Sequence, residues 1–157
     1  MTGSAPEAKR YALKLLAYRG RSEQELGERL ARKGFESDVI ESVTRDLKKA
    51  GFIDDTQLAL SLKRQAREGR LLGHRATRIF LLKRGLSREV VDAVLDYDQD
   101  DELNVLQRLL EKKARSADDM QTLAGRRRFW NFLVRKGYST EVIRRVMKEF
   151  DFDEEAS

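Results

Sequence analysis

A run of basic residues in the middle of the chain offers the most distinctive chemistry in this sequence. Residues 63 to 88 contain nine lysines and arginines and a single acid, Glu68. Solvated faces usually mix charges of both signs, and an anionic partner would relieve the repulsion within such a run. We therefore predict a surface that binds phosphate groups, with an inert solvated face as the alternative. The predicted surface comprises Lys63, Arg64, Arg67, Arg70, Arg75, Arg78, Lys83 and Arg84.

The spacing of these bases predicts how helices present them. Arg64, Arg67 and Arg70 recur at steps of three, which would place them on one side of a helix that continues into a glycine-containing loop. Arg75 and Arg78 have the same spacing on the next helix.

A second basic cluster lies beside aromatic residues. The segment 126–128 is three arginines, Arg126, Arg127 and Arg128, and Phe129 and Trp130 follow it. Bases next to aromatic rings can contact phosphates and stack on unpaired nucleobases, so we add the three arginines to the predicted surface. We expect Phe129 to be core, and Trp130 is open to either role.

The sequence offers little material for catalysis or metal binding. His74 has no carboxylate near it in sequence, and the Asp54-Asp55 pair fits a helix cap. There is no P-loop and no nucleophile elbow. An acidic segment follows the basic run, but it lacks the spacing and mid-loop glycine of a calcium loop. Its members are Asp92, Asp96, Asp98, Asp100, Asp101 and Glu102. We expect no enzyme activity, metal or cofactor.

Composition narrows the class of protein. Charged residues make up 38% of the 157 residues, the net charge is +5, and cysteine is absent. A typical charged share is about 25%. No apolar run approaches the roughly 20 residues of a membrane span, and the start of the chain does not resemble a signal peptide. We expect a cytoplasmic, monomeric protein that does not enter membranes.

The elements that must position these residues are predicted to be helices in a repeat. Apolar residues fall at helical spacing, and the one proline is Pro6. Three glycine turns share a pattern with leucine at −4, an acid at +4 and valine at +9 from the glycine, at intervals of 51 and 52 residues. The turns are Arg32-Lys33-Gly34-Phe35, Lys83-Arg84-Gly85-Leu86 and Arg135-Lys136-Gly137-Tyr138.

Each turn is predicted to join two helices of a hairpin. Bases end the first helix, glycine takes the left-handed position after it, and Ser87 or Ser139 caps the second helix. Ser37 would do the same in the first copy. A further helix precedes each hairpin, so we predict an all-α fold of three tandem three-helix repeats in an elongated, curved array. The predicted segments are a flexible N-terminus (1–7), the repeats (8–52, 53–98 and 99–150) and an acidic tail (151–157).

Motifs in the first repeat carry a family resemblance. They are Arg21-Ser22-Glu23-Gln24-Glu25-Leu26, Lys33-Gly34-Phe35 and Gly51-Phe52-Ile53-Asp54-Asp55. With the three-helix periodicity, they make the chain from about Ala8 to Phe150 resemble the RecX family of recombinase regulators. We expect these motifs to serve structure, with Ser22 and Glu25 forming a capping box.

The resemblance implies a regulator, most often an inhibitor, of the RecA recombinase. Such proteins bind the filament of RecA on single-stranded DNA, limit its ATPase, strand exchange or extension, and have some affinity for DNA itself, duplex DNA included.

Two alternatives to a RecA regulator stay open. One is an independent DNA-binding protein that uses its helix–turn–helix hairpins, although the segment Arg88 to Tyr97 is mostly apolar and acidic, which suits packing better than a DNA groove. The other is a helical scaffold for an acidic protein partner.

Overall fold

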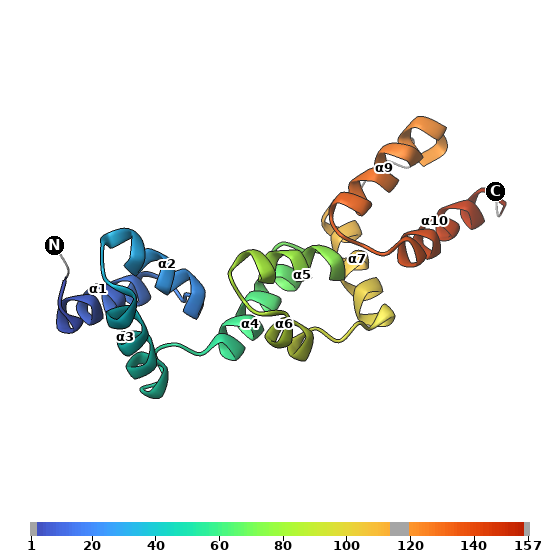
Figure 1. The fold of residues 1–157 in the computed structure, drawn as a ribbon. Helices are drawn as coiled ribbons and strands as arrows, with labels where there is room; N and C mark the ends of the chain where they lie inside the picture. The colour runs from blue at the N-terminus through green and yellow to red at the C-terminus, as the bar shows by residue number, and fades with distance from the viewer. Residues whose placement is uncertain (1–2, 114–119, 156–157) are drawn as a thin grey trace. The chain divides into compact units, whose positions relative to one another are not determined.

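The computed structural model describes residues 3–113 and 120–155, with side chains up to residue 149. Within these ranges the chain forms helices and no strand, which confirms the all-α prediction (Figure 1). None of the described helices is long and apolar enough to cross a membrane. The segment between Lys112 and Leu123 falls partly outside the described residues.

Three helices form each repeat, as predicted. The first repeat has α1 (Ala5–Tyr18), α2 (Glu23–Lys33) and α3 (Ser37–Lys49). The second has α4 (Asp55–Arg64), extended by a π-helical turn η1 (Gln65–Gly69), then α5 (His74–Lys83) and α6 (Arg88–Val94). The third has α7 (Gln99–Lys112), α9 (Leu123–Arg135) and α10 (Thr140–Glu155).

The chain is divided into two compact units. Unit 1 is Met1–Leu62 with Leu81–Val94, and unit 2 is Lys63–Phe80 with Leu95–Ser157. The predicted repeat boundaries and the elongated, curved shape stay predictions. Both predicted end segments are partly helical. Residues 5–7 of the predicted N-terminal segment form the first turn of α1, and α10 continues through the predicted tail to Glu155.

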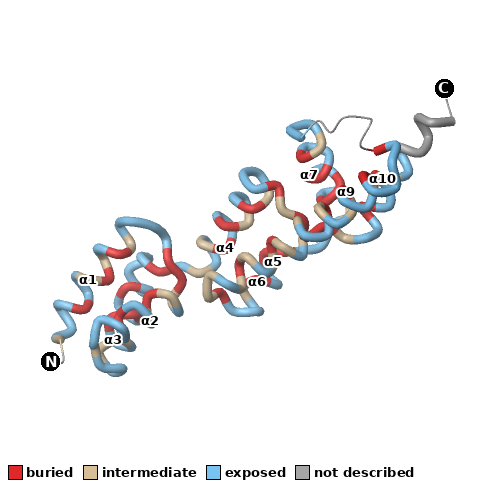
Figure 2. The backbone as a smooth tube through the Cα atoms, turned by 90° about the horizontal axis from the view of Figure 1, so that it is seen from above, coloured by how far each residue is buried: buried red, intermediate tan, exposed pale blue. Residues whose placement is uncertain are grey.

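Each unit has its own apolar core, visible as buried stretches of the helices in Figure 2. In unit 1, side chains of α1, α2 and α3 pack together at helical spacing, because their apolar stripes face one another. They are Ala8, Ala12, Leu15, Leu26, Leu30, Val43 and Leu47, joined by Ile53. In unit 2, α7, α9 and α10 supply most of the core, and Phe129 is buried in it as predicted. Leu71, from the second repeat, packs into this same core.

The glycine turns and most of the predicted caps are confirmed. Gly34, Gly85 and Gly137 have φ of 103°, 79° and 89°, in the left-handed region that a β-carbon disfavours. The Ser87 and Ser139 hydroxyls accept the backbone N–H groups of Val90 and Val142 at 3.2 and 3.3 Å.

The capping box of α2 is also present, since the Ser22 hydroxyl and the Glu25 carboxylate each accept the other residue's N–H at 3.1 Å. The prediction for Ser37 is wrong. Helix α3 begins at Ser37 itself, and its N-cap is Glu36, which makes no side-chain cap bond. Glu36 stands two residues after its turn glycine, as Ser87 and Ser139 do, so the position of the cap is kept and the choice of a serine misplaced the prediction by one residue.

Within each unit, a turn glycine of one repeat packs closely against the preceding repeat. In unit 1, a β-carbon on Gly85 would lie 2.8 Å from the Ser22 hydroxyl oxygen, which donates to the Arg84 carbonyl at 2.6 Å. In unit 2, a β-carbon on Gly137 would lie 2.3 Å from that of Ala76. The turn of one repeat thus packs against the start of the second helix of the repeat before it. At Gly34 no heavy atom of the described residues would lie within 4 Å of such a carbon.

Candidate nucleic-acid interface

The predicted basic surface is divided between the two units. Lys83 and Arg84 belong to unit 1. Unit 2 holds the other nine residues, namely Lys63, Arg64, Arg67, Arg70, Arg75, Arg78, Arg126, Arg127 and Arg128. Most of the predicted surface therefore belongs to unit 2.

Two predicted contacts are engaged in ion pairs. The Arg84 Nε lies 3.2 Å from Glu25 Oε2, and its Nη2 donates to the Gly20 carbonyl at 3.0 Å. Burial disfavours the charged carboxylate of Glu25, but hydrogen bonds from Arg84 and the Ser22 N–H hold its pKa below the usual value. Arg67 Nη2 lies 3.7 Å from Asp101 Oδ2. Arg84 therefore serves the junction between the first two repeats, and Arg67 ties the second repeat to α7.

The prediction that Arg64, Arg67 and Arg70 share one helix side is wrong. The α-helix ends at Arg64, and the π-helical turn that follows changes the direction of the next side chains. Arg64 is exposed, Arg67 is half-buried in its ion pair, and the Arg70 guanidinium lies over the Phe80 ring, 5.1 Å from its centroid.

The remaining predicted bases differ in how far they are exposed. Lys63, Arg78 and Arg126 are half-buried and interact with other groups of the chain, Arg126 through a 2.6 Å hydrogen bond to the Met120 carbonyl. Six are exposed and form no ion pair within residues 3–113 and 120–149: Arg64, Arg70, Arg75, Lys83, Arg127 and Arg128. Helix α9, which bears Arg127 and Arg128, contains no acid. Trp130, beside them, packs partly against the core of unit 2.

The loop of residues 70–73 is fixed in place by the turn of the third repeat. Leu71 has a φ of 53°, unusual for a residue with a side chain, and is 5% exposed. Its carbonyl accepts the Tyr138 hydroxyl at 2.6 Å, and the Gly73 N–H donates to the Lys136 carbonyl at 2.9 Å. Burial raises the pKa of Tyr138, and the nearby Glu102 charge adds to this, so the phenol stays protonated and remains a donor.

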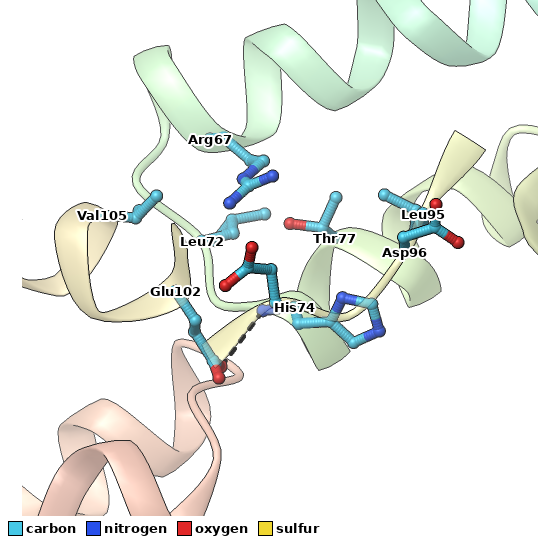
Figure 3. Close-up of a pocket in the computed structure, with 9 residues that line it drawn as sticks. Arg67, Leu72, His74, Thr77, Leu95, Asp96, Glu102 and Val105 are labelled. Atoms are coloured by element: carbon cyan, nitrogen blue, oxygen red, sulfur yellow. Dashed lines mark hydrogen bonds between the residues drawn. The ribbon is translucent and has the colours of Figure 1, made fainter. Parts of the chain in front are cut away.

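A buried carboxylate holds two helix starts together beneath this loop (Figure 3). Glu102 Oε1 accepts the backbone N–H of Ser139 at 2.9 Å and that of His74 at 3.3 Å. The His74 ring stands edge-on to Tyr97, with centroids 5.1 Å apart. The adjoining cavity has a volume of about 10 Å³, which accommodates a water molecule and not a nucleotide.

Several acids of the acidic segment have structural partners. Asp98 caps α7 by accepting the N–H groups of Asp100 and Asp101, at 2.9 and 3.3 Å. Asp54 likewise caps α4 through the Gln57 N–H at 3.1 Å, while Asp55 accepts the Glu23 N–H at 3.0 Å. The capping role expected at Asp54 is confirmed.

Two further bases of the surface escaped the sequence analysis. Lys136, the C-cap of α9, donates to the Arg70 carbonyl, and Lys113, the C-cap of α7, lies over the ring of Phe132, one helical turn before Lys136. The available signal was the position of Lys136 directly before the turn glycine, which is also that of Arg84.

Comparisons with known proteins identify the family. Residues 8–52 match "RecX, first three-helix domain", and residues 100–147 match "RecX, third three-helix domain". The chain is 30% identical over 144 residues to "Regulatory protein RecX" of Amycolatopsis mediterranei, covering 91% of this chain and 82% of that one. It is 35% identical over 149 residues to that of Treponema pallidum, covering 90% and 84%.

Solved structures agree with the fold. A crystal structure of RecX from Lactobacillus salivarius is similar with a TM-score of 0.82 at 21% identity, over 94% of this chain and 97% of that chain. A second crystal structure, of regulatory protein RecX, gives a TM-score of 0.77 at 21% identity, over 92% and 71%. The sequence motifs, the three-helix repeats and these relatives agree: the chain belongs to the RecX family of regulatory proteins.

Proposed function

We propose that this protein regulates a RecA recombinase by binding its filament on single-stranded DNA. Binding would limit the ATPase, strand exchange or extension of the filament, so the protein acts as an inhibitor in the cytoplasm, as a monomer and without a catalytic step of its own. The supporting observation is a set of exposed bases in unit 2 with no ion pair among the described residues, notably Arg64, Arg75, Arg127 and Arg128. An anionic partner would supply the missing negative charge.

The mechanism follows from the kind of contact these bases make. Long cationic side chains on helices suit the phosphates of a strand, which fix position without reading sequence. A bound regulator would compete with DNA for the filament or disfavour the active subunit interface. Several weak contacts along one chain would add through their high effective concentration.

The first test is the ATPase rate of a bacterial RecA on single-stranded DNA, with this protein titrated in. We expect strong inhibition well below one copy per RecA subunit, with little loss of free DNA. No inhibition, together with tight binding to naked duplex DNA, would favour the independent DNA-binding protein. If the protein neither inhibits RecA nor binds naked duplex DNA, but captures an acidic protein, the helical scaffold for an acidic partner would be favoured.

Charge reversal on the exposed surface tests the location of the contact. The triple variant Arg64→Glu, Arg75→Glu and Arg128→Glu should abolish filament binding while helicity and melting temperature persist, because these side chains are exposed. Binding of the wild-type protein should weaken steeply with salt as phosphate contacts are screened.

A matched control carries the same change in net charge in unit 1. Arg10, Arg29 and Arg32 are exposed residues of α1 and α2. Their reversal to Glu should leave most of the inhibition intact. Equal losses in both triple variants would show that net charge alone governs binding and would remove this surface from the proposal.

A further inference from the structure

Three cationic side chains from three separate segments lie near one another in unit 2. Arg70 follows the π-helical turn, and Lys113 and Lys136 are the C-caps of α7 and α9. We call them the three-base cluster. The Lys136 Nζ donates to the Arg70 carbonyl at 3.1 Å, the Arg70 guanidinium lies 5.1 Å from the Phe80 centroid, and the Lys113 Nζ lies 4.8 Å from the Phe132 centroid.

Among the described residues, no carboxylate compensates the positive charge of the cluster. None of the three bases forms an ion pair with a carboxylate in the described part of the chain. Burial lowers the pKa of Lys136, and the charges of Lys113 and Arg70 lower it further. Like charges held together without a counter-charge raise the free energy of the fold unless an anion binds there.

Arg84 of the second repeat occupies the position that corresponds to Lys136, and it has a carboxylate partner. Arg84 also stands directly before a turn glycine and also donates to a carbonyl of the preceding repeat, that of Gly20 at 3.0 Å. Its charge is balanced by Glu25, 3.2 Å away. Lys136 keeps the bond to a carbonyl, but in the part of the chain that the structure describes two more bases and no carboxylate lie near it.

The cluster is also pre-organised. Both the strained, buried Leu71 and the bonds that the third-repeat turn makes to residues 70–73 fix the backbone that bears Arg70. The aromatic faces of Phe80 and Phe132 restrict two of the cations, so less entropy is lost when an anion binds.

We propose that Arg70, Lys113 and Lys136 form a binding site for a backbone phosphate of a single DNA strand. The site rests on the proposed function for its source of phosphate, the strand within the filament. It adds Lys113 and Lys136 to the interface and gives Arg70 a defined partner. The contact is independent of nucleobase, since only phosphate oxygens are bound.

The test uses a fluorescent oligothymidylate, the whole protein and no RecA. In the double variant Arg70→Ala and Lys113→Ala, the Arg70 carbonyl that holds Lys136 is retained. We expect weaker binding and a shallower dependence of log K on log salt. Each lost phosphate contact on a single strand lowers that slope by about 0.7. Acetylation of Lys113, followed by mass spectrometry, should be slowed by the oligonucleotide in the wild-type protein.

The matched control is Arg10→Ala with Lys33→Ala in unit 1. It removes the same charge and also one cation over a ring, because the Lys33 Nζ lies 5.3 Å from the Tyr11 centroid. This variant should keep the wild-type slope. Equal slopes in the two double variants, or an unchanged slope after removal of Arg70 and Lys113, would overturn the site. Circular dichroism verifies that both variants are folded.

The outcomes separate this site from the proposed function. Loss of oligonucleotide affinity confined to the Arg70–Lys113 variant supports the site, even where RecA is not inhibited and the proposed function fails. If the protein inhibits RecA but its oligonucleotide affinity does not depend on Arg70 and Lys113, the site is overturned and the proposed function stands. Protection of Lys113 by inorganic phosphate as strong as that by the oligonucleotide would overturn the assignment to a strand.

Discussion

Glu102 shows how a single side chain can organise a unit. Its side chain comes from the first turn of α7, is 3% exposed, and joins the starts of α5 and α10 through two backbone N–H groups. A buried carboxylate is tolerated only where donors compensate for its lost hydration. The acidic segment therefore contributes at least one acid to the fold itself.

His74 gives a pH prediction at the same scale. Burial lowers its pKa; Glu102 opposes this shift, and Arg67, Arg78 and Lys63 add to it. The folded protein then binds fewer protons than the unfolded chain, in which the pKa is about 6.5. Stability should therefore rise with pH between the two pKa values, and it should be lost as pH falls below about 6.5.

Melting temperatures between pH 7.5 and 5.5 check this expectation, since His74 is the one histidine of the chain. His74→Gln should flatten the profile in this interval. A histidine pKa above 6.5 in a proton NMR titration would contradict the argument.

At the scale of the element, the same turn has different surroundings in different repeats. Gly34→Ala places a β-carbon in open space among the described residues, so its cost is the left-handed backbone, roughly 1–2 kcal/mol. Gly137→Ala has that strain and also a contact of 2.3 Å with the Ala76 β-carbon. Overpacking typically adds about 1–3 kcal/mol.

Urea unfolding of the two variants measures the difference directly. We expect Gly137→Ala to be the more destabilised, by about the overpacking cost. Equal midpoints and slopes would mean that the turn of the third repeat does not pack as described.

The whole molecule depends on bonds that join one repeat to the next. Ser22 is fully buried, caps α2 through the Glu25 N–H, and donates to the Arg84 carbonyl of the second repeat. Ser22→Ala should therefore cost the cap, about 1 kcal/mol, and a further 1 kcal/mol or so for the bond between repeats. Ser87→Ala removes a cap alone, from an exposed serine.

Thermal or denaturant unfolding of the pair separates the two contributions. A Ser22→Ala variant no less stable than Ser87→Ala would show that the bond between repeats contributes little. Both variants should keep their helical signal by circular dichroism.

Several features that depend on residues close together in sequence were predicted correctly. The glycine turns, the caps at Ser22, Ser87 and Ser139, and the buried Phe129 all follow from residue type and helical spacing. The pairing of Arg84 with Glu25 spans 59 residues of sequence, and the three-base cluster requires three segments to converge. No periodicity encodes either arrangement. The π-helical turn after Arg64 also escaped prediction, because Gly69 at its end marks where a helix stops and not the change of helical phase before it.

The unequal surroundings of the turn glycines have an evolutionary consequence. Asparagine tolerates the left-handed conformation better than other residues with side chains, and position 34 has room for it. At positions 85 and 137 the space is filled by Ser22 and Ala76, so the absence of a side chain matters there as much as the backbone angle. Lineages that diverge from this sequence should therefore substitute the first glycine early and retain the other two. The three turns, similar in sequence, should therefore differ in how strictly they require glycine.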